Sequence, residues 1–217
     1  MNSSIKLKIC GITQPLQALE IASLGVHAIG VIAVKNSPRF ITSYKRHKLF
    51  QSLEEFYPNT KRVLVVANIN DHELEETMSI KGSPSIIQLH GDESIEECQR
   101  LRLKYPDIEL WKAFRIRSKP DLVSINNYAK TVDSFLLDSW SNDALGGTGH
   151  KIQTKFINSK GFEVPFWMAG GICAEWIPEL LKTIKPFGID ASSKLEKSPG
   201  IKDIKKVKDL IKAIEVN

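Results

Sequence analysis

The sequence predicts an α/β protein, a single-domain (β/α)₈ TIM barrel spanning residues 1–217, on three observations. Short apolar runs alternate with longer amphipathic stretches almost without exception, a pattern typical of parallel βα units. Eight such runs can be counted, and eight units in this chain would average about 27 residues, at the small end for such a barrel. The first run is followed by Cys10-Gly11-Ile12-Thr13, whereas a doubly wound open sheet usually has G-x-G-x-x-G at that place.

The elements can be assigned in chain order from these patterns. The expected strands are Lys6–Cys10, Ala28–Val34, Arg62–Ala67, Ser85–Leu89, Glu109–Phe114, Ser134–Asp138, Pro165–Ala169 and Phe187–Asp190. Amphipathic periodicity predicts helices at Gln14–Leu24, Asp71–Ile80, Ser94–Leu103, Ala174–Ile184 and Asp203–Ile214. Asp71 and Ser94 stand where an N-cap would start a helix. Since no linker or repeat interrupts the alternation, one domain is expected.

The composition is that of a soluble globular protein, with 42% hydrophobic and 25% charged residues. The net charge is +5, from 30 Lys and Arg against 25 Asp and Glu. Lysines near the carboxyl terminus alternate with Ile and Val at helical spacing, which favours a solvated helix face over a nucleic-acid interface. A mild positive charge also suits an anionic small-molecule substrate.

Cysteine usage and hydropathy point to the cytoplasm. The three cysteines, Cys10, Cys98 and Cys173, are far apart and form no C-x-x-C pair, so a zinc ribbon or redox motif is not expected. The amino terminus has no apolar signal region, and no run reaches transmembrane length. A reducing cytoplasm is therefore the expected compartment, without a membrane partner.

In a barrel of this kind, chemistry takes place at the carboxyl ends of the strands. The first strand ends in Cys10 and the sixth in Asp138. Taken alone, Cys10 is more often a small buried hydrophobe. Asp138 could equally be a helix cap or part of a loop salt bridge.

Three loops rich in small residues follow consecutive strands: Gly146–Gly149, Gly170–Gly171 and Ala191–Ser193. Barrels often bind phosphate with the loops after strands seven and eight, where glycine lets the backbone approach the anion. Gly149, Gly170 and Gly171 are therefore candidate phosphate contacts. Ser192 and Ser193 have no neighbouring His to activate them, so they are expected to act as donors and not as nucleophiles.

Two further strand ends carry candidate binding residues. Arg39, after the second strand, can offer a planar fork to a carboxylate, or can be an ordinary surface arginine. His90, after the fourth strand, could be a base, a ligand or a hydrogen-bonded structural residue. No second ligand accompanies it at metal spacing, so no metal is expected. Cys98 and Trp176 fall in helical segments and are expected to pack in the core.

Taken together, the strand ends resemble the phosphoribosylanthranilate isomerase family. The resemblance spans nearly the whole chain, and its most specific parts are the Lys-Ile-Cys-Gly-Ile-Thr opening and the Gln-Leu-His-Gly strand end. The matching segments are Lys8–Thr13, Ser37–Arg39, Gln88–Gly91, Trp111–Phe114, Leu137–Ser139, Gly146–Gly149, Ala169–Ile172, Gly188–Ser193 and Pro199–Asp203.

The resemblance implies a cytoplasmic enzyme of tryptophan biosynthesis, an intramolecular oxidoreductase of the aldose–ketose isomerase type, with no metal or organic cofactor. In the family pattern Asp138 matches the general acid, Cys10 the general base, and Arg39 the residue that holds the anthranilate carboxylate. His90 matches a substrate-side residue, and the phosphate site matches Gly149, Gly170, Gly171, Ser192 and Ser193. The thiol would need activation by local dipoles or cations. The family includes monomers and homodimers, so either is expected.

Some positions depart from the family pattern, and two alternatives remain. Lys194 stands where a glycine is usual, Trp176 replaces an asparagine, and residues 150–153 differ from the usual run. Another phosphosugar-barrel isomerase would typically show paired aspartates at strands one and five, where this chain has Cys10 and Phe114-Arg115. A non-catalytic barrel binding a phosphorylated ligand would have no need for both Cys10 and Asp138.

Overall fold

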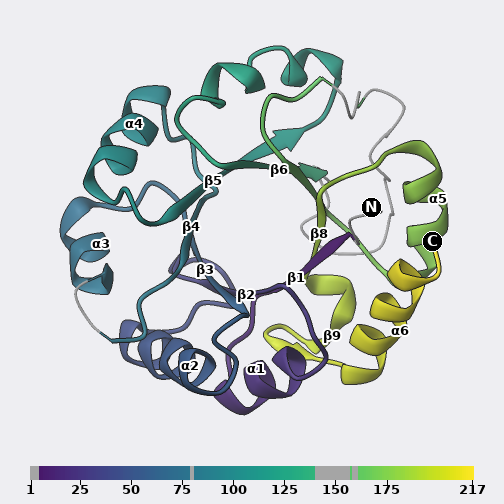
Figure 1. Ribbon diagram of the computed structural model, residues 1–217. Coiled ribbons are helices and arrows are strands. Elements are labelled where there is room, and N and C mark those ends of the chain that lie inside the picture. The colour runs from purple at the N-terminus through teal and green to yellow at the C-terminus, as the bar shows by residue number, and fades with distance from the viewer. Residues whose placement is uncertain (1–4, 79–80, 140–156, 158–160) are drawn as a thin grey trace.

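The protein folds as a closed barrel of eight parallel strands that follow one another around the ring in sequence order, as the view along the barrel in Figure 1 shows. The computed structural model describes residues 5–78, 81–139, 157 and 161–217. The predicted (β/α)₈ fold is confirmed. The strands are β1 (Lys6–Cys10), β2 (Ala28–Ile32), β3 (Lys61–Val66), β4 (Ile86–Leu89), β5 (Glu109–Ile116), β6 (Ser134–Ser139), β7 (Phe166–Ala169) and β8 (Gly188–Ala191).

Helices surround the barrel and cover its outer face (Figure 1). The α-helices are α1 (Pro15–Ala22), α2 (Ser43–Phe56), α3 (Asp71–Met78), α4 (Ile95–Lys104), α5 (Ile177–Thr183) and α6 (Ile204–Glu215). Short 3₁₀ helices are η1 (Lys119–Leu122), η2 (Ile125–Tyr128), η4 (Ala174–Trp176) and η5 (Ser193–Leu195). A small antiparallel hairpin of β9 (Glu196–Ser198) and β10 (Ile201–Lys202) lies between β8 and α6.

The predicted helix starts are right in one case and wrong in the other. Ser94 caps α4 in a reciprocal capping box, since its hydroxyl accepts from the Glu97 amide and the Glu97 carboxylate accepts from the Ser94 amide. At α3 the cap is Asn70, whose side-chain oxygen accepts from the Glu73 amide at 2.9 Å. The expected N-cap, Asp71, is instead the first helical residue, and its carboxylate accepts two hydrogen bonds from Arg100.

Other regions also differ from the sequence expectation, which assigned no helix to the residues of α2. The helix expected at Ala174–Ile184 begins as the 3₁₀ turn η4 and continues as α5, which has a proline in its first turn. The β9–β10 hairpin was not expected at all, because its strands are only three and two residues long. Cys98 and Trp176 are buried, so their predicted packing role is confirmed.

The core has two parts, one inside the barrel and one between the barrel and its helices. Each of the eight barrel strands is parallel to its neighbours and covered on both faces, which explains why these strands read as continuous apolar runs. Inside the barrel, Trp111 and Trp167 pack with ring centroids 4.6 Å apart. Gly188 makes room for them, since a Cβ there would come within 2.4 Å of the Trp167 ring. These two rings fill the interior, so the barrel is a packed core and not a pore.

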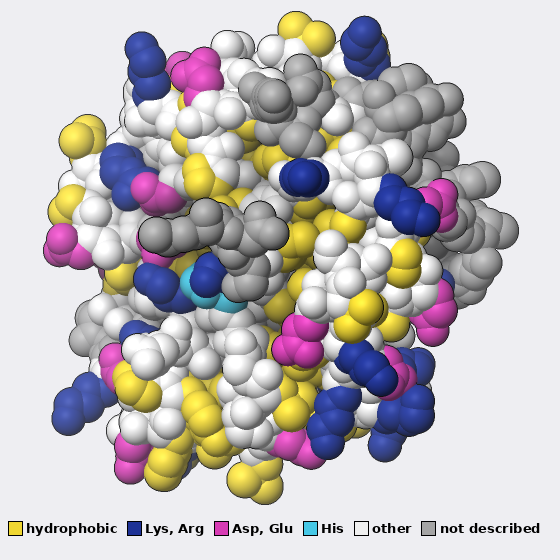
Figure 2. All heavy atoms as spheres, turned by 45° about the vertical axis from the view of Figure 1, so that its right-hand side comes forward, with side chains coloured by type: hydrophobic (Ala, Val, Ile, Leu, Met, Phe, Trp, Pro, Cys, Tyr) yellow, Lys and Arg dark blue, Asp and Glu magenta, His cyan; other side chains and the backbone are white. Residues whose placement is uncertain are grey.

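Most of the lysine-rich carboxyl-terminal segment forms α6 and has the expected amphipathic character, but Lys202, expected on the same solvated face, lies in β10 and is buried. Val207 and Leu210 are buried against the core, whereas the Lys205 side chain is exposed and pairs with Asp209 one turn later. On the face in Figure 2, Lys and Arg side chains are spread out and interspersed with acidic ones. A solvated helix face explains this pattern better than a surface for nucleic acid does.

Candidate active site

Cys10 lies at the carboxyl end of β1 and belongs to the side chains packed inside the barrel. The site is close-fitting, because a Cβ on Gly30 of the neighbouring strand would lie 2.7 Å from the Cys10 sulfur. Beneath it, the fully buried Lys8 ammonium donates to Asp190 of β8 at 2.8 Å. The alternation of a strand places Lys8 and Cys10 on the same interior face.

The charges around Cys10 act in opposite directions on its thiol. Burial, the largest effect, raises the pKa of Cys10, whereas the nearby Lys8 and Lys202 ammonium groups lower it and Asp190 raises it. The expected activating cations are therefore present, but in the ligand-free protein the pKa of Cys10 is raised and the thiol form is favoured. A buried thiolate formed there would be a stronger base than an ordinary one.

Asp138 lies near the end of β6 and faces His90, which follows β4. The His90 Nε2 atom lies 3.4 Å from Asp138 Oδ2, and each side chain is a quarter to a third exposed. The Gln88 side-chain nitrogen lies 3.0 Å from the other ring nitrogen of His90. An amide nitrogen can only donate, so Nδ1 accepts and the ring proton is placed on Nε2, the ring nitrogen nearer to Asp138. Since β5 separates the two strands, this contact also shows that Asp138 faces the barrel mouth.

Arg39, in the loop after β2, forms a two-pronged ion pair with Glu196 of β9. Its Nε atom donates to Oε1 at 2.8 Å and its Nη2 atom to Oε2 at 2.7 Å. The Arg39 side chain crosses Gly11, where an added Cβ would lie 2.5 Å from the Arg39 Cδ atom. Arg39 is thus held next to Cys10, and it is not a free surface arginine.

Lys202 of β10 is a second cation that contacts Glu196. Its fully buried ammonium donates to Glu196 at 2.7 Å, and to the backbone and hydroxyl oxygens of Ser192 at 3.2 and 3.3 Å. The Ser192 hydroxyl in turn donates to the Cys10 carbonyl at 2.9 Å. Ser192 therefore connects the β9–β10 hairpin to the end of β1.

The residues expected to bind phosphate are placed by β7 and β8, with one exception. Gly170 and Gly171 follow β7 with positive φ angles of 91° and 65°, a conformation that glycine adopts readily. Ser193 and Lys194 are exposed at the start of η5. Gly149, the rest of the Gly146–Gly149 loop and residues 150–153 lie outside the described residues.

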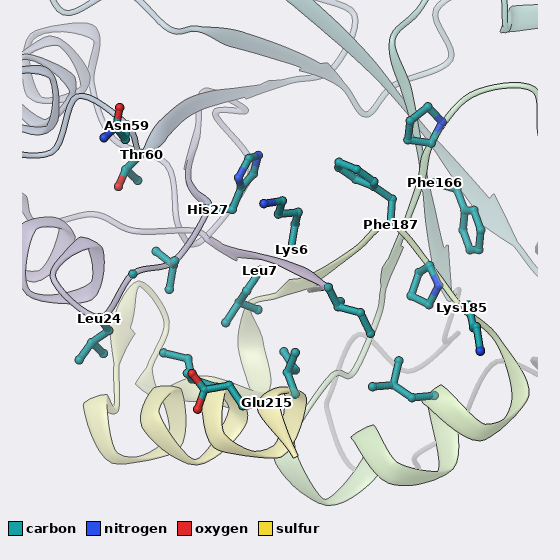
Figure 3. Close-up of a pocket in the computed structure, with 18 of the residues that line it drawn as sticks. Lys6, Leu7, Leu24, His27, Asn59, Thr60, Phe166, Lys185, Phe187 and Glu215 are labelled. Carbon is teal, nitrogen blue, oxygen red and sulfur yellow. The ribbon is translucent and has the colours of Figure 1, made fainter. Parts of the chain in front are cut away.

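Two cavities lie at opposite ends of the barrel. The smaller, of about 420 Å³, is lined by His90 and other residues that follow β4, by the second half of β5 and by residues after it. The larger, of about 1500 Å³, is lined by residues that precede or begin strands, among them Lys6, His27 and Phe187 (Figure 3). It thus lies at the amino-terminal face, which in this fold serves stability, whereas chemistry occurs at the carboxyl face. Choosing the active site by cavity volume alone would therefore point to the wrong end of the barrel.

Among the described residues, no cluster of three or more His, Cys, Asp or Glu side chains could hold a metal ion. In the same part of the chain, no helix is long and apolar enough to cross a membrane.

The fold and the site together define a (β/α)₈-barrel enzyme with a thiol and a carboxyl group at its catalytic face. Comparison with known proteins narrows this class. The family model for N-(5'-phosphoribosyl)anthranilate isomerase matches residues 7–213, and the chain belongs to this family. Its relatives include the N-(5'-phosphoribosyl)anthranilate isomerase of Synechococcus elongatus, 40% identical over 98% of this chain and 97% of that protein. That of Acaryochloris marina is also 40% identical, over 97% and 98%.

Solved structures agree with this assignment. Phosphoribosylanthranilate isomerase from Thermotoga maritima superposes with a TM-score of 0.87 at 27% identity, covering 98% of this chain and all of that one. Another phosphoribosylanthranilate isomerase, solved with reduced 1-(o-carboxyphenylamino)-1-deoxyribulose 5-phosphate, gives a TM-score of 0.83 at 26% identity over 98% and 100%. A third structure shows monomers generated from the dimeric Thermotoga maritima enzyme, with a TM-score of 0.82 at 26% identity over the same shares.

Four charged residues of the site were given no role from the sequence: Lys8, Asp190, Glu196 and Lys202. One signal was available, since a lysine within the otherwise apolar run Leu7–Cys10 requires a buried partner. That partner, Asp190, is 182 residues away. Glu196 and Lys202 gave no comparable signal, because they lie in a segment whose hairpin was not expected.

Proposed function

We propose that this chain isomerises N-(5'-phosphoribosyl)anthranilate to 1-(2-carboxyphenylamino)-1-deoxyribulose 5-phosphate by general acid–base catalysis, with Cys10 as base and Asp138 as acid. Membership of the family supports the reaction. The single observation that supports the roles is that both side chains face the interior of one barrel mouth, from the ends of β1 and β6. No cofactor is needed, because the reaction moves only protons and electron pairs within the substrate.

The reaction needs an acid first. Asp138 in its protonated form gives a proton to the furanose ring oxygen as the bond from that oxygen to C1 breaks. The ring opens, and the anthranilate nitrogen and C1 form a protonated Schiff base. Because its Nε2 atom lies 3.4 Å from Asp138 Oδ2, His90 restrains the carboxyl group in the mouth of the barrel by contact. In this proposal His90 acts on the substrate indirectly, by holding Asp138 in place.

The base acts second. The Schiff base acidifies the proton on C2, and the Cys10 thiolate removes it to give an enolamine. Protonation at C1 and loss of the enol proton from the C2 hydroxyl then give the ketose, so atoms and charge balance. Lys8 and Lys202 favour the thiolate that this step requires.

The substrate is held at its two anionic ends. The Arg39 guanidinium binds the anthranilate carboxylate, since Glu196 occupies only two of its five donors. The loops after β7 and β8 bind the phosphate through Gly170, Gly171, Ser192 and Ser193, and Gly149 is proposed to complete this group. The Ser192 hydroxyl already donates its hydrogen bond to the Cys10 carbonyl, so Ser192 would contact the phosphate through its backbone.

The test is direct measurement of isomerisation, followed as loss of anthranilate-type fluorescence from freshly made substrate. The parent is expected to be active. Cys10→Ser and Asp138→Asn should each lower kcat about 10²-fold or more, a scale typical of lost acid–base catalysis. Matched controls are Cys98→Ala in α4 and Asp107→Asn in the α4–β5 loop, which should retain activity.

Each contrary outcome has a distinct meaning. A folded but inactive parent contradicts the isomerase proposal and favours a barrel that binds another phosphorylated ligand. Activity that survives both site substitutions contradicts the roles given to Cys10 and Asp138 while leaving the reaction in place.

A further inference from the structure

Glu196 is a shared counter-ion for two cations that come from different parts of the chain. It accepts two hydrogen bonds from Arg39 and one from Lys202, and its Oε1 atom also accepts from the Gly200 amide at 3.1 Å. The Glu196 side chain is 6% exposed and that of Lys202 is fully buried. Burial acts to raise the pKa of Glu196, but the hydrogen bonds from Arg39 and Lys202 outweigh it and lower the pKa.

This cluster of Arg39, Glu196 and Lys202 lies against the proposed base. Gly11, the residue after Cys10, has room for no side chain because the Arg39 stem and the Ser192 hydroxyl occupy the space. Lys202 contacts Ser192, whose hydroxyl bonds to the Cys10 carbonyl. The cluster is thus connected to Cys10 by two routes, through the adjoining residue Gly11 and through Ser192.

The charges around Cys10 leave one cation uncompensated among the described residues. Lys8 is balanced by Asp190, whereas Glu196 faces both Arg39 and Lys202. The net charge of +1 is balanced when one anion is added, either a ligand carboxylate or the Cys10 thiolate. Loss of Glu196 would raise this charge and release Arg39, while loss of Lys202 would lower it and leave Arg39 in place.

We propose that Glu196 is a positioning residue that fixes Arg39 for the substrate carboxylate and, through Lys202, sets the charge that the Cys10 thiol experiences. The inference depends on the proposed function for the roles of Arg39 and Cys10. It adds that the two roles share one carboxylate, supplied by the β9–β10 hairpin. Glu196 itself contacts neither reacting atom of the substrate.

The test compares three substitutions with two measurements. One measurement is the KM and kcat of the isomerisation. The other is the titration of Cys10 in the ligand-free protein, followed by thiolate ultraviolet absorbance. Subtracting the same variant with Cys10→Ser removes the signals of Cys98 and Cys173.

Glu196→Gln keeps the shape of the side chain and removes its charge. It should raise KM about tenfold or more, the scale of a lost charge-assisted pair, and should make Cys10 titrate at lower pH. Lys202→Met should shift the Cys10 titration in the opposite direction, to higher pH. Its effect on KM should be smaller than that of Glu196→Gln. The other charges facing Cys10, on Lys8, Asp190 and Arg39, are the same in both variants.

Glu196→Asp separates geometry from charge. It should raise KM, because the shorter side chain cannot reach both cations, and leave the Cys10 titration near that of the parent. It also serves if Glu196→Gln fails to fold by circular dichroism. A purely structural role would lower kcat in all three variants without moving the titration in opposite directions.

The outcomes separate this inference from the proposed function. Opposite shifts in the Cys10 titration support the charge coupling even if the parent proves inactive, because that measurement needs no substrate. If the parent is active but Glu196→Gln changes neither KM nor the titration, the inference is wrong and the isomerase function stands. Shifts in the same direction for Glu196→Gln and Lys202→Met would also overturn it.

Discussion

The His90 Nε2 atom lies 3.4 Å from Asp138 Oδ2, although His90 follows β4 and Asp138 lies in β6, and these strands are not neighbours. Such a contact forms only across the mouth of the barrel, above β5. The contact restrains Asp138, the proposed acid, with a side chain that comes from the β4 end of the mouth. His90 is itself held by Gln88, two residues earlier at the end of β4.

Replacing His90 with Asn should lower kcat about fivefold, because one polar side-chain contact contributes about 1 kcal/mol, with a smaller effect on KM. The reason is that Asp138 would lose its restraint while the groups that hold the substrate remain. Steady-state kinetics with His72→Asn as the matched control, an exposed histidine of α3, would test this. An unchanged kcat would contradict a positioning role for His90.

Gly11 and Gly25 form a natural pair for a second prediction. Both have positive φ, 76° and 79°, but a Cβ on Gly11 would collide with Arg39, whereas a Cβ on Gly25 would meet nothing within 4 Å. Each alanine variant should lose about 1 kcal/mol of unfolding free energy through backbone strain. Gly11→Ala should also raise KM by displacing Arg39. Equal kinetics for the two variants would show that the Arg39 position does not matter.

The buried Lys8–Asp190 pair should couple strongly in unfolding experiments. Lys8→Met leaves Asp190 buried without its cation and should cost about 3–5 kcal/mol. The double variant Lys8→Met/Asp190→Asn removes both charges and should recover much of that loss. Denaturant unfolding of all four combinations gives the coupling energy. If the double variant is as unstable as the sum of the single ones, the pair is not coupled.

The lowered pKa of Glu196 should make the free energy of unfolding depend on pH in the acid range. Its pKa is lowered in the folded protein from the ordinary value of 4.5, so the folded state binds this proton less tightly than the unfolded state does. Its contribution is therefore complete above pH 4.5 and is lost as pH falls through the lower, folded value. The difference in unfolding free energy between the parent and Glu196→Gln should shrink below pH 4.5. A difference that stays constant down to pH about 3 would contradict this.

How far the sequence determines the structure depends on the range of the interaction. Hydrophobic periodicity is local, so all eight strands were predicted within a few residues, and Ser94 was recognised as a helix cap. The same reasoning placed Cys10 and Asp138 at strand ends, hence at one face. It failed at Asp71, because the neighbouring Asn70 competes for the cap and only the backbone geometry decides between them.

The tertiary structure alone decided which charged groups meet. Closing the barrel places β1 beside β8, so Lys8 pairs with Asp190, 182 residues away. The β9–β10 hairpin brings Glu196 to Arg39, 157 residues away. Lys8 alone carries a local signal, because it interrupts an apolar run, but nothing local identifies its partner Asp190 or joins Glu196 to Arg39. The sequence therefore determined the barrel and the face where the chemistry occurs, whereas the fold determined the electrostatic surroundings of Cys10 and the partner of Arg39.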